Sequence, residues 1–207
     1  MVDIGGNIGS CSFLMLAAGA RRVVTFEPVA FNLYYLTRSI LANPIEWKNR
    51  FTLYPIALGA EDGVHSIFME KGNAGNSVIG KPIHANNGVT LNISVRRFDD
   101  MLWPNPLTPP PKISLLKIDA QGFEMKVFAG ARRLVEARAI QCIVTEIATD
   151  WLIGQGTSPS AYCNFLWDNG FDLFHGNGKR VTQDESKNWD TRSVVTDIQG
   201  CLKSLTV

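Results

Sequence analysis

The sequence predicts an α/β fold built on a mostly parallel sheet with helices on both faces. Short apolar runs alternate with segments that carry apolar residues at helical spacing, and polar residues stand where the apolar runs end. A glycine-rich turn directly follows the first apolar run. This alternation implies right-handed crossovers between parallel strands, and the ligands of such sheets bind beyond the carboxyl ends of the strands.

Seven strands and four longer helices follow from the apolar pattern. We expect strands at residues 2–4, 22–26, 51–56, 113–119, 140–146, 171–175 and 193–198, the last with the weakest pattern. We expect helices at residues 8–18, 29–43, 122–136 and 158–170. The last of these has Ser158 as its N-cap, Pro159 in its first turn and Gly170 as its stop.

Residues 57–112 interrupt the alternation of strand and helix. Residues 57–63 read as a turn, and the short alternating runs over 63–95 predict a β-hairpin insertion between the third and fourth strands. The proline-rich stretch 104–112 cannot be helical and forms an exposed connector. The length suits one domain, which we place at residues 1–207. Because no element precedes the first strand, we expect N-terminal elements upstream of Met1.

Charge and hydropathy exclude two classes of partner. The 20 Lys and Arg residues balance the 19 Asp and Glu residues to a net charge of +1, so no basic field is available to hold nucleic acid. The apolar runs are much shorter than the roughly 20 residues of a membrane span, and no leader precedes Val2. We therefore expect a soluble domain, and the sequence assigns it no localisation.

The cysteines and histidines show no metal-binding pattern. The four cysteines lie far apart without a C-x-x-C pair, so we expect reduced, packed thiols at Cys11, Cys142, Cys163 and Cys201. No metal-ligand spacing connects the three histidines, His65, His84 and His175. We expect no resident metal, although a pair formed by Asp119 and Glu146 has the chemistry to hold Mg²⁺.

The opening stretch MVDIGGNIGSCSFL forms a strand, a glycine turn and a helix, which together make a ligand-binding corner. A dinucleotide or S-adenosylmethionine fits such a corner. Dinucleotide sites use G-x-G-x-x-G, whereas Asp3 begins a D-x-G-x-x-x-G pattern here, and its carboxylate suits an ammonium group better than a phosphate. The register of the glycines therefore favours S-adenosylmethionine.

Glu27 stands at the end of the second predicted strand. A carboxylate in this position accepts hydrogen bonds from both hydroxyls of a ribose, as it also does in sites for nicotinamide cofactors. The simpler alternative is that Glu27 only caps the helix that follows. We favour the ribose role because Glu27 occurs together with the glycine corner.

An ordered series of motifs resembles the FkbM family of S-adenosylmethionine-dependent methyltransferases. The series consists of VDIGGNIGSCSF, VVTFEP, IALGAEDG, GNSVI, RRFDDML, LLKIDAQGFEMKVFAGARRLV and IVTE, and it spans about residues 2–147. The resemblance implies a Rossmann-like class I methyltransferase fold. It also implies O-methylation, commonly of a hydroxyl on a sugar-like or other small-molecule or glycan acceptor.

The resemblance also assigns cofactor-binding positions. It implies that Asp3, Gly5, Gly6 and Asn7 surround the methionine part and that Glu27, with Pro28 beside it, holds the ribose. Ala57 and Leu58 would lie near the adenine, and Asp119 would close the pocket. The cofactor implied is S-adenosyl-L-methionine.

Two positions depart from the family pattern. The family commonly has K-I-D-V-E-G where this chain has Lys117 to Gly122 with Gln121 in place of the glutamate. An amide still forms hydrogen bonds but cannot take up a proton, so any role of that carboxylate as a base or metal ligand is lost. Gly6 replaces a common alanine, which we expect to loosen the turn.

Transfer of a methyl group to a hydroxyl needs alignment of the reacting atoms and a base for the proton. We expect Asp119 or Glu146 to be that base, because both lie at carboxyl ends of adjacent strands. His175 is the second choice, since a lone histidine at a strand end is more often structural. Trp151 and Trp189 are candidates for stacking on a sugar ring, whereas Trp167 fits the core.

Three functions from different classes remain open. The first is an S-adenosylmethionine-dependent O-methyltransferase. The second is a nicotinamide-dependent oxidoreductase, against which the glycine register and the absence of a Tyr-x-x-x-Lys motif argue. The third is a relative that keeps the cofactor corner without catalysis, which Gln121 suggests.

Overall fold

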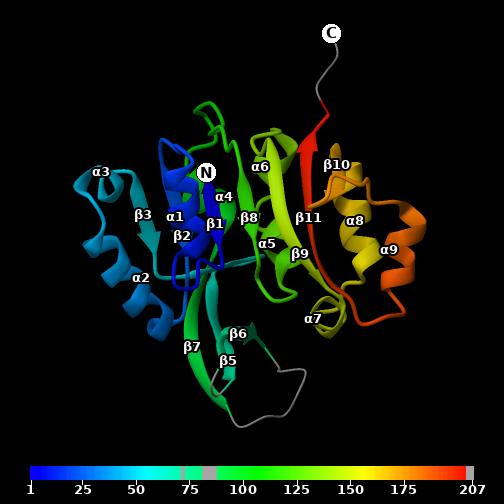
Figure 1. The fold of residues 1–207 in the computed structure, drawn as a ribbon, viewed down its shortest axis with the longest axis horizontal. Helices are drawn as coiled ribbons and strands as arrows, with labels where there is room; N and C mark the ends of the chain where they lie inside the picture. Colours follow the sequence, from blue (N-terminus) through cyan, green and yellow to red (C-terminus); the bar gives the residue numbers. More distant parts are fainter. Residues whose placement is uncertain (71–72, 81–87, 204–207) are drawn as a thin grey trace.

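Strands and helices alternate along the chain in the computed structural model, which describes residues 1–70, 73–80 and 88–203 (Figure 1). A seven-stranded sheet has the order β10-β11-β9-β8-β1-β2-β3. Strand β11 pairs antiparallel with both of its neighbours, and the other pairings are parallel. This mixed sheet with its helices confirms the predicted α/β class. Its strands are β1 (Val2–Ile4), β2 (Val23–Phe26), β3 (Phe51–Tyr54), β8 (Leu116–Ile118), β9 (Cys142–Ala148), β10 (Phe171–His175) and β11 (Val195–Leu202).

The order of the strands reverses beside β1. From β1 the chain moves outward to β2 and β3, and it then returns to place β8 on the other side of β1. Strands β1 and β8 are central, so Val2, Ile4, Leu116 and Ile118 are buried, as near-continuous apolar runs require. Ligands of open α/β sheets bind at such a reversal, outside the carboxyl ends of the strands.

The helices begin and end at residues that explain their limits. Helix α1 begins at Ser10, later than predicted, because Gly9 before it is left-handed with φ of 98°. The predicted helix over 122–136 is two short helices, α5 (Glu124–Ala129) and α6 (Arg132–Glu136), and Gly130 lies between them. Position 130 requires glycine because a Cβ there would be 2.0 Å from the carbonyl oxygen of Gly59. Helix α8 starts as predicted, with the Ser158 hydroxyl accepting from the Ala161 N–H.

The sequence pattern did not predict four of the short helices. They fall in regions to which it assigned no helix or strand, namely α3, α4, α7 and α9. The helices are α1 (Ser10–Ala17), α2 (Ala30–Ala42), α3 (Ile45–Lys48), α4 (Phe98–Leu102), α5 (Glu124–Ala129), α6 (Arg132–Glu136), α7 (Thr149–Gly154), α8 (Pro159–Asp168) and α9 (Gln183–Trp189). None of the helices in the described ranges combines the length and apolar character that crossing a membrane requires.

A second, four-stranded sheet lies beside the carboxyl ends of β1, β2 and β3, below the main sheet in Figure 1. Its order is β4-β7-β5-β6, and β5 pairs antiparallel with β6 and β7. The third strand of the main sheet ends at Tyr54, before Pro55, which has no N–H for a ladder. Residues 57–59, predicted to be part of a turn, instead form the first strand of this sheet. Its strands are β4 (Ala57–Gly59), β5 (Gly63–Glu70), β6 (Asn73–Ile79) and β7 (Gly88–Arg97).

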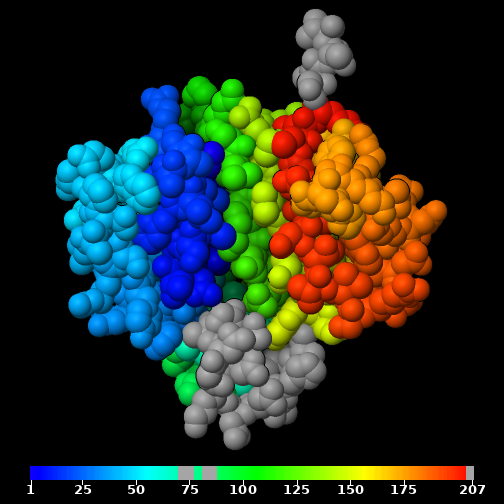
Figure 2. Space-filling view, viewed as in Figure 1, coloured from blue at the N-terminus to red at the C-terminus, as the bar shows by residue number. Residues whose placement is uncertain are grey.

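The main core cluster joins the main sheet to the second sheet and to the helices that follow β8 and β9. Its largest fully buried side chains come from β2, α4, α6, α8 and the central strands, and include Phe26, Phe98, Leu116, Ile118, Leu134 and Tyr162. On the face seen in Figure 2, strands β8 and β9 reach the surface between the blue N-terminal region and the red strand β11. Side chains that point out of this part of the sheet are therefore accessible.

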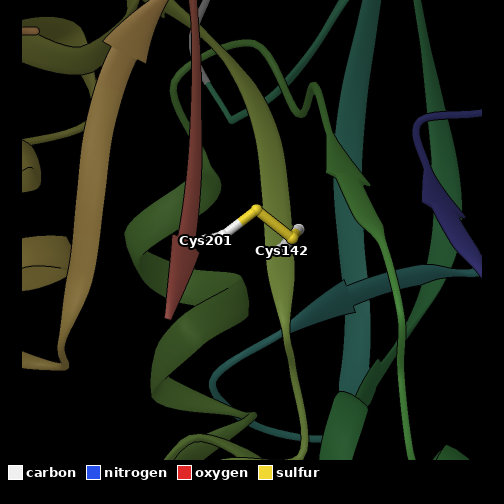
Figure 3. The surroundings of a disulfide bond; sticks show 2 residues. All are labelled: Cys142 and Cys201. Atoms are coloured by element: carbon white, nitrogen blue, oxygen red, sulfur yellow. A yellow bond between two sulfur atoms is a disulfide. The ribbon is translucent and has the colours of Figure 1, made fainter. Parts of the chain in front are cut away.

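Two of the four cysteines form a disulfide, so the prediction of four reduced thiols is wrong for Cys142 and Cys201 (Figure 3). The two residues stand directly opposite each other on β9 and β11, which are antiparallel. The predicted last strand ended at residue 198, whereas β11 continues to Leu202 and brings Cys201 into the ladder. Cys11 and Cys163 are free, and burial raises the pKa of Cys163 to about 12.

Removal of this disulfide is predicted to lower stability. The bond joins residues separated by 59 positions, and the chain-entropy estimate for such a loop is about 4 kcal/mol. Cys201→Ser should therefore lower the free energy of unfolding by about that amount in urea titrations without reductant. Reductant should bring the wild type to the same value, and Cys11→Ser serves as the control without effect. Labelling of four thiols in the unfolded, unreduced chain would contradict the prediction.

Candidate functional site

The glycine turn after β1 is fixed by the backbones of two other segments. The N–H groups of Gly5 and Gly6 both donate to the carbonyl oxygen of Phe26, each at 3.0 Å. Gly5 has φ of 74°, and a Cβ there would lie 2.0 Å from the carbonyl oxygen of Asp119. Only glycine allows this combination of conformation and close approach. The turn is thus pressed between the ends of β2 and β8.

Gly6 makes room for a threonine of β2 rather than loosening the turn as predicted. A Cβ on Gly6 would lie 2.2 Å from the Cγ2 methyl of Thr25. Thr25 is fully buried, and its hydroxyl lies 2.7 Å from that of Ser12 in α1. Because Thr25 occupies this space, a side chain at position 6 would require a smaller residue or a shift at position 25.

Glu27 is 4% exposed and holds the turn to the start of α2. Its Oε2 accepts from the Asn7 N–H and its Oε1 from the Val29 N–H, each at 2.8 Å. The side-chain amide of Asn32 donates to Oε1 at 3.2 Å. Burial raises the pKa of Glu27, and the two backbone N–H groups act in the opposite direction. Glu27 therefore joins the glycine turn to Val29, the residue before α2 (Ala30–Ala42). No side chain among the described residues caps the N-terminus of α2, so the simpler alternative, that Glu27 only caps this helix, is wrong.

A cavity lies at the carboxyl ends of β1, β2 and β8, where the second sheet meets the main sheet. Its walls come from the glycine turn, the start of α2, strands β4, β5 and β6, and the loop after β8. Seven of the nine predicted cofactor residues line it, namely Gly5, Asn7, Glu27, Pro28, Ala57, Leu58 and Asp119. The other polar residues in its lining are Asn32, Ser77 and Gln121.

Asp3 and Gly6 are outside that lining. Asp3 is fully buried beneath the turn. Its Oδ2 accepts from the Ser12 hydroxyl at 2.5 Å, and its Oδ1 lies 3.3 Å from the Lys117 ammonium. Both oxygens of the carboxylate thus contact protein groups. Its link to the cavity is Lys117, which donates to the carbonyl oxygen of Gly5.

Lys117 is a residue that the sequence analysis missed. Its ammonium donates to the carbonyl oxygen of Gly5 at 2.8 Å and lies between the carboxylates of Asp3 and Asp119, at 3.3 and 3.6 Å. Burial alone would lower the pKa of Lys117, but the two carboxylates outweigh it and the pKa is raised. The ammonium therefore stays charged. A lysine inside the apolar run ISLLKID was the available signal.

Asp119 borders two cavities. It lines the cavity with Glu27 and a second one, of about 350 Å³, that also contains Glu146 and Asp197. The side-chain amide of Gln121, in a left-handed residue with φ of 51°, donates to Asp119 Oδ1 at 2.9 Å. A glutamate at position 121 would place a second negative charge there, so Gln121 changes the interaction from repulsion to a hydrogen bond.

Glu146 lies in the second cavity, directly across from Asp197 of β11. Partial burial raises its pKa, the negative charges of Asp119 and Asp197 raise it further, and Lys117 opposes the shift. A carboxylate with a raised pKa is a stronger base than an unperturbed one. Both predicted bases, Asp119 and Glu146, thus line the second cavity. Of the two, only Asp119 also lines the cavity with Glu27.

The remaining aromatic and histidine candidates lie away from these cavities. His175 is 3.1 Å from Glu185 and packs edge-to-face on Trp189, which is 7% exposed. This arrangement is typical of structural residues. Trp167 packs against the core and Trp151 is half-buried. His84 lies outside the described residues, and within the described part of the chain no three His, Cys, Asp or Glu side chains are arranged to hold a metal.

Glu124 supports the loop that carries Gln121. It is 2% exposed, and its Oε1 accepts from the N–H groups of Ala120 and Gly122 at 2.8 and 3.3 Å. Burial raises the pKa of Glu124 to about 7, against the effect of these N–H groups. Its Oε2 has no hydrogen-bond partner among the described residues. The carboxyl group is thus partly protonated at neutral pH.

Glu124→Gln is predicted to change the pH dependence of stability. Since the pKa is raised from 4.5 to about 7, the stabilising contribution is complete below pH 4.5 and is lost as the pH rises through 7. A glutamine stays neutral and its carbonyl can still accept, so the variant should gain up to about 3 kcal/mol over the wild type between pH 4.5 and 8. Urea titrations at both pH values measure this. Exposed Glu46→Gln is the control, and parallel profiles of wild type and Glu124→Gln would refute the prediction.

The comparisons with known proteins agree with this architecture. Residues 3–173 match the methyltransferase FkbM domain. The crystal structure of methyltransferase FkbM from Methylobacillus flagellatus KT is similar, with a TM-score of 0.54 and 20% identity over 97% of this chain and 42% of that chain. The methyltransferase domain of bacterial CtHen1-CN has a TM-score of 0.50 and 8% identity, covering 97% of this chain and 89% of that one. At these identities, the likeness shows a shared fold.

The family match extends past residue 147, where the resemblance of the motifs ended, and reaches into β10. The search of curated proteins gave no match. The chain spans less than half the length of the Methylobacillus protein. The match to residues 3–173 covers most of the 207 residues, and the chain therefore belongs to the FkbM methyltransferase domain family.

Proposed function

We propose that this chain binds S-adenosylmethionine in the cavity beside Glu27 and transfers its methyl group to a hydroxyl of a sugar-like or other small-molecule or glycan acceptor. The observation that carries the proposal is that Glu27, fixed by two backbone N–H groups, lines the same cavity as the glycine turn and Asp119. Membership of a methyltransferase family supports it.

The donor and acceptor groups of the cavity fit the parts of this cofactor. Glu27 is a hydrogen-bond acceptor suited to ribose hydroxyls, and apolar Ala57 and Leu58 suit the adenine ring. Gly5 and Asn7 line the cavity on the side of the glycine turn, where this proposal puts the methionine part, and Pro28 adds to the wall beside Glu27. The negative charge of Asp119 suits a cationic sulfur.

Asp3 and Gly6 take supporting roles in this proposal. Asp3 keeps Lys117 charged and in contact with the carbonyl oxygen of Gly5. This contact helps to hold the turn in place. Gly6 lets the turn rest on Thr25. Neither residue needs to touch the ligand to shape its site.

When bound, the cofactor supplies a methyl group on a positively charged sulfur. The chain has to align an acceptor hydroxyl in line with the carbon–sulfur bond at about 3–3.5 Å and take up its proton as the oxygen–carbon bond forms. Asp119 borders both cavities, so it stands between the cofactor position and an acceptor in the second cavity. Asp119 or Glu146 is the base in this proposal.

Gln121 favours a second candidate, a relative that binds the cofactor without catalysis. Its amide occupies one oxygen of Asp119, and no carboxylate stands at position 121. The two functions share the cofactor and differ in turnover. Binding and turnover are therefore tested separately.

Binding of S-adenosylhomocysteine, measured by calorimetry, tests the cofactor. We expect micromolar binding, no binding of NAD, and about 10- to 100-fold weaker binding by Glu27→Ala, since hydrogen bonds to a charged group contribute about 1.5–3 kcal/mol. Glu46→Ala, which changes an exposed glutamate, should bind like the wild type. Binding of NAD instead would establish the oxidoreductase alternative, and binding of neither compound would reject the proposed cofactor.

Turnover tests the base. With a panel of sugar and polyol acceptors and methyl-labelled cofactor, Asp119→Asn or Glu146→Gln should lower the rate about 10²- to 10⁴-fold, the usual contribution of a general base. Both variants should retain binding of S-adenosylhomocysteine within a few-fold. Equal turnover in the wild type and both variants would eliminate the two carboxylates as bases, and wild-type binding without turnover on any acceptor would favour the non-catalytic candidate.

A further inference from the structure

Asn32 is a buried polar residue of the cavity for which neither the motifs nor the family pattern assigned a role. It is the third residue of α2, is 3% exposed and lines the cavity beside Glu27. Its side-chain carbonyl oxygen, Oδ1, has no hydrogen-bond partner among the described residues. Buried polar atoms are rarely left without a partner, so an unpartnered oxygen on a residue that lines a cavity points to a donor on a ligand.

The orientation of the Asn32 amide follows from its neighbour. Its Nδ2 donates to Glu27 Oε1 at 3.2 Å. If the amide were rotated by 180°, Oδ1 would face the carboxylate oxygen, and two acceptors would oppose each other. The hydrogen bond to Glu27 thus excludes the rotated form and directs Oδ1 away from that carboxylate.

Glu27 and Asn32 both line the cavity and are joined by a hydrogen bond, so each contributes an acceptor to the same part of its wall. Each oxygen of Glu27 already accepts at least one N–H from the protein, whereas Oδ1 of Asn32 accepts none from the described residues. The two side chains are joined by a hydrogen bond, so a diol that reaches Glu27 with one hydroxyl brings its second hydroxyl near Asn32. The chemical group that fits two adjacent acceptors is a pair of neighbouring hydroxyls.

We propose that Asn32 is a second ribose-binding residue, whose Oδ1 accepts a hydrogen bond from the ribose hydroxyl that Glu27 does not bind. This inference rests on the proposed function. It makes the site selective for a nucleoside ligand with both ribose hydroxyls free, and it assigns one hydroxyl to each side chain.

Deoxy analogues of S-adenosylhomocysteine test this assignment. In the wild type, removal of either the 2′- or the 3′-hydroxyl should weaken binding about tenfold. In Asn32→Ala, the parent compound should bind about tenfold more weakly, and one of the two deoxy analogues should bind no worse than the parent compound. In Glu27→Ala, the other deoxy analogue should bind no worse than the parent compound. Asn49→Ala, which alters an exposed asparagine, should behave as the wild type.

The outcomes separate this inference from the proposed function. Two results would overturn the assignment of Asn32 while the wild type still binds S-adenosylhomocysteine. In the first, Asn32→Ala still binds both deoxy analogues more weakly than the parent compound. In the second, Asn32→Ala becomes insensitive to the same deoxy analogue as Glu27→Ala. The second result would mean that Asn32 acts only by holding Glu27. The N6-dimethyl analogue lacks the N–H donors of the adenine amino group. If Asn32→Ala binds it as well as the parent compound while the wild type binds it more weakly, Oδ1 of Asn32 binds the adenine and the ribose assignment is overturned. If the wild type binds none of the compounds, both proposals are overturned.

Discussion

The ends of β2, β1 and β8 meet at the glycine turn, and the candidate site depends on that contact. The backbone N–H of Gly5 donates to the carbonyl oxygen of Phe26, and the backbone N–H of Asp119 donates to that of Ile4. The Lys117 ammonium donates to the carbonyl oxygen of Gly5. Because a Cβ on Gly5 would lie 2.0 Å from the carbonyl oxygen of Asp119, the approach requires glycine. Backbone groups therefore place Glu27 and Asp119, which are far apart in the sequence, on the wall of one cavity.

The charges around this contact are balanced in two different ways. Asp3 and Asp119 share the ammonium of Lys117, so one cation serves two carboxylates. Glu27 is held mainly by N–H groups of the protein, which satisfy a carboxylate without fixing a cation in the cavity. In our proposal this leaves Glu27 free to accept ligand hydroxyls, while Asp119 faces the cationic end of the ligand.

The sequence predicted the parts of the site that depend on local patterns. The glycine turn and Glu27 stand where apolar strands end, and the parallel sheet brings such ends together. Asn32 and Glu124 could not be found in this way, because their importance lies in contacts across loops and in burial. The disulfide was missed for a related reason: the pairing of Cys142 with Cys201 depends on the register of two strands, which the pattern of residues 193–198 did not define.

The central claim is that the contact between β1, β2 and β8 forms a site for S-adenosylmethionine. A crystal structure of the chain with S-adenosylhomocysteine tests it most directly. The account predicts a ribose hydroxyl within about 2.6–3.2 Å of the Glu27 carboxylate, the adenine against Ala57 and Leu58, and the sulfur on the side of Asp119. A ligand bound elsewhere, or in this cavity with its ribose away from Glu27, would contradict the account.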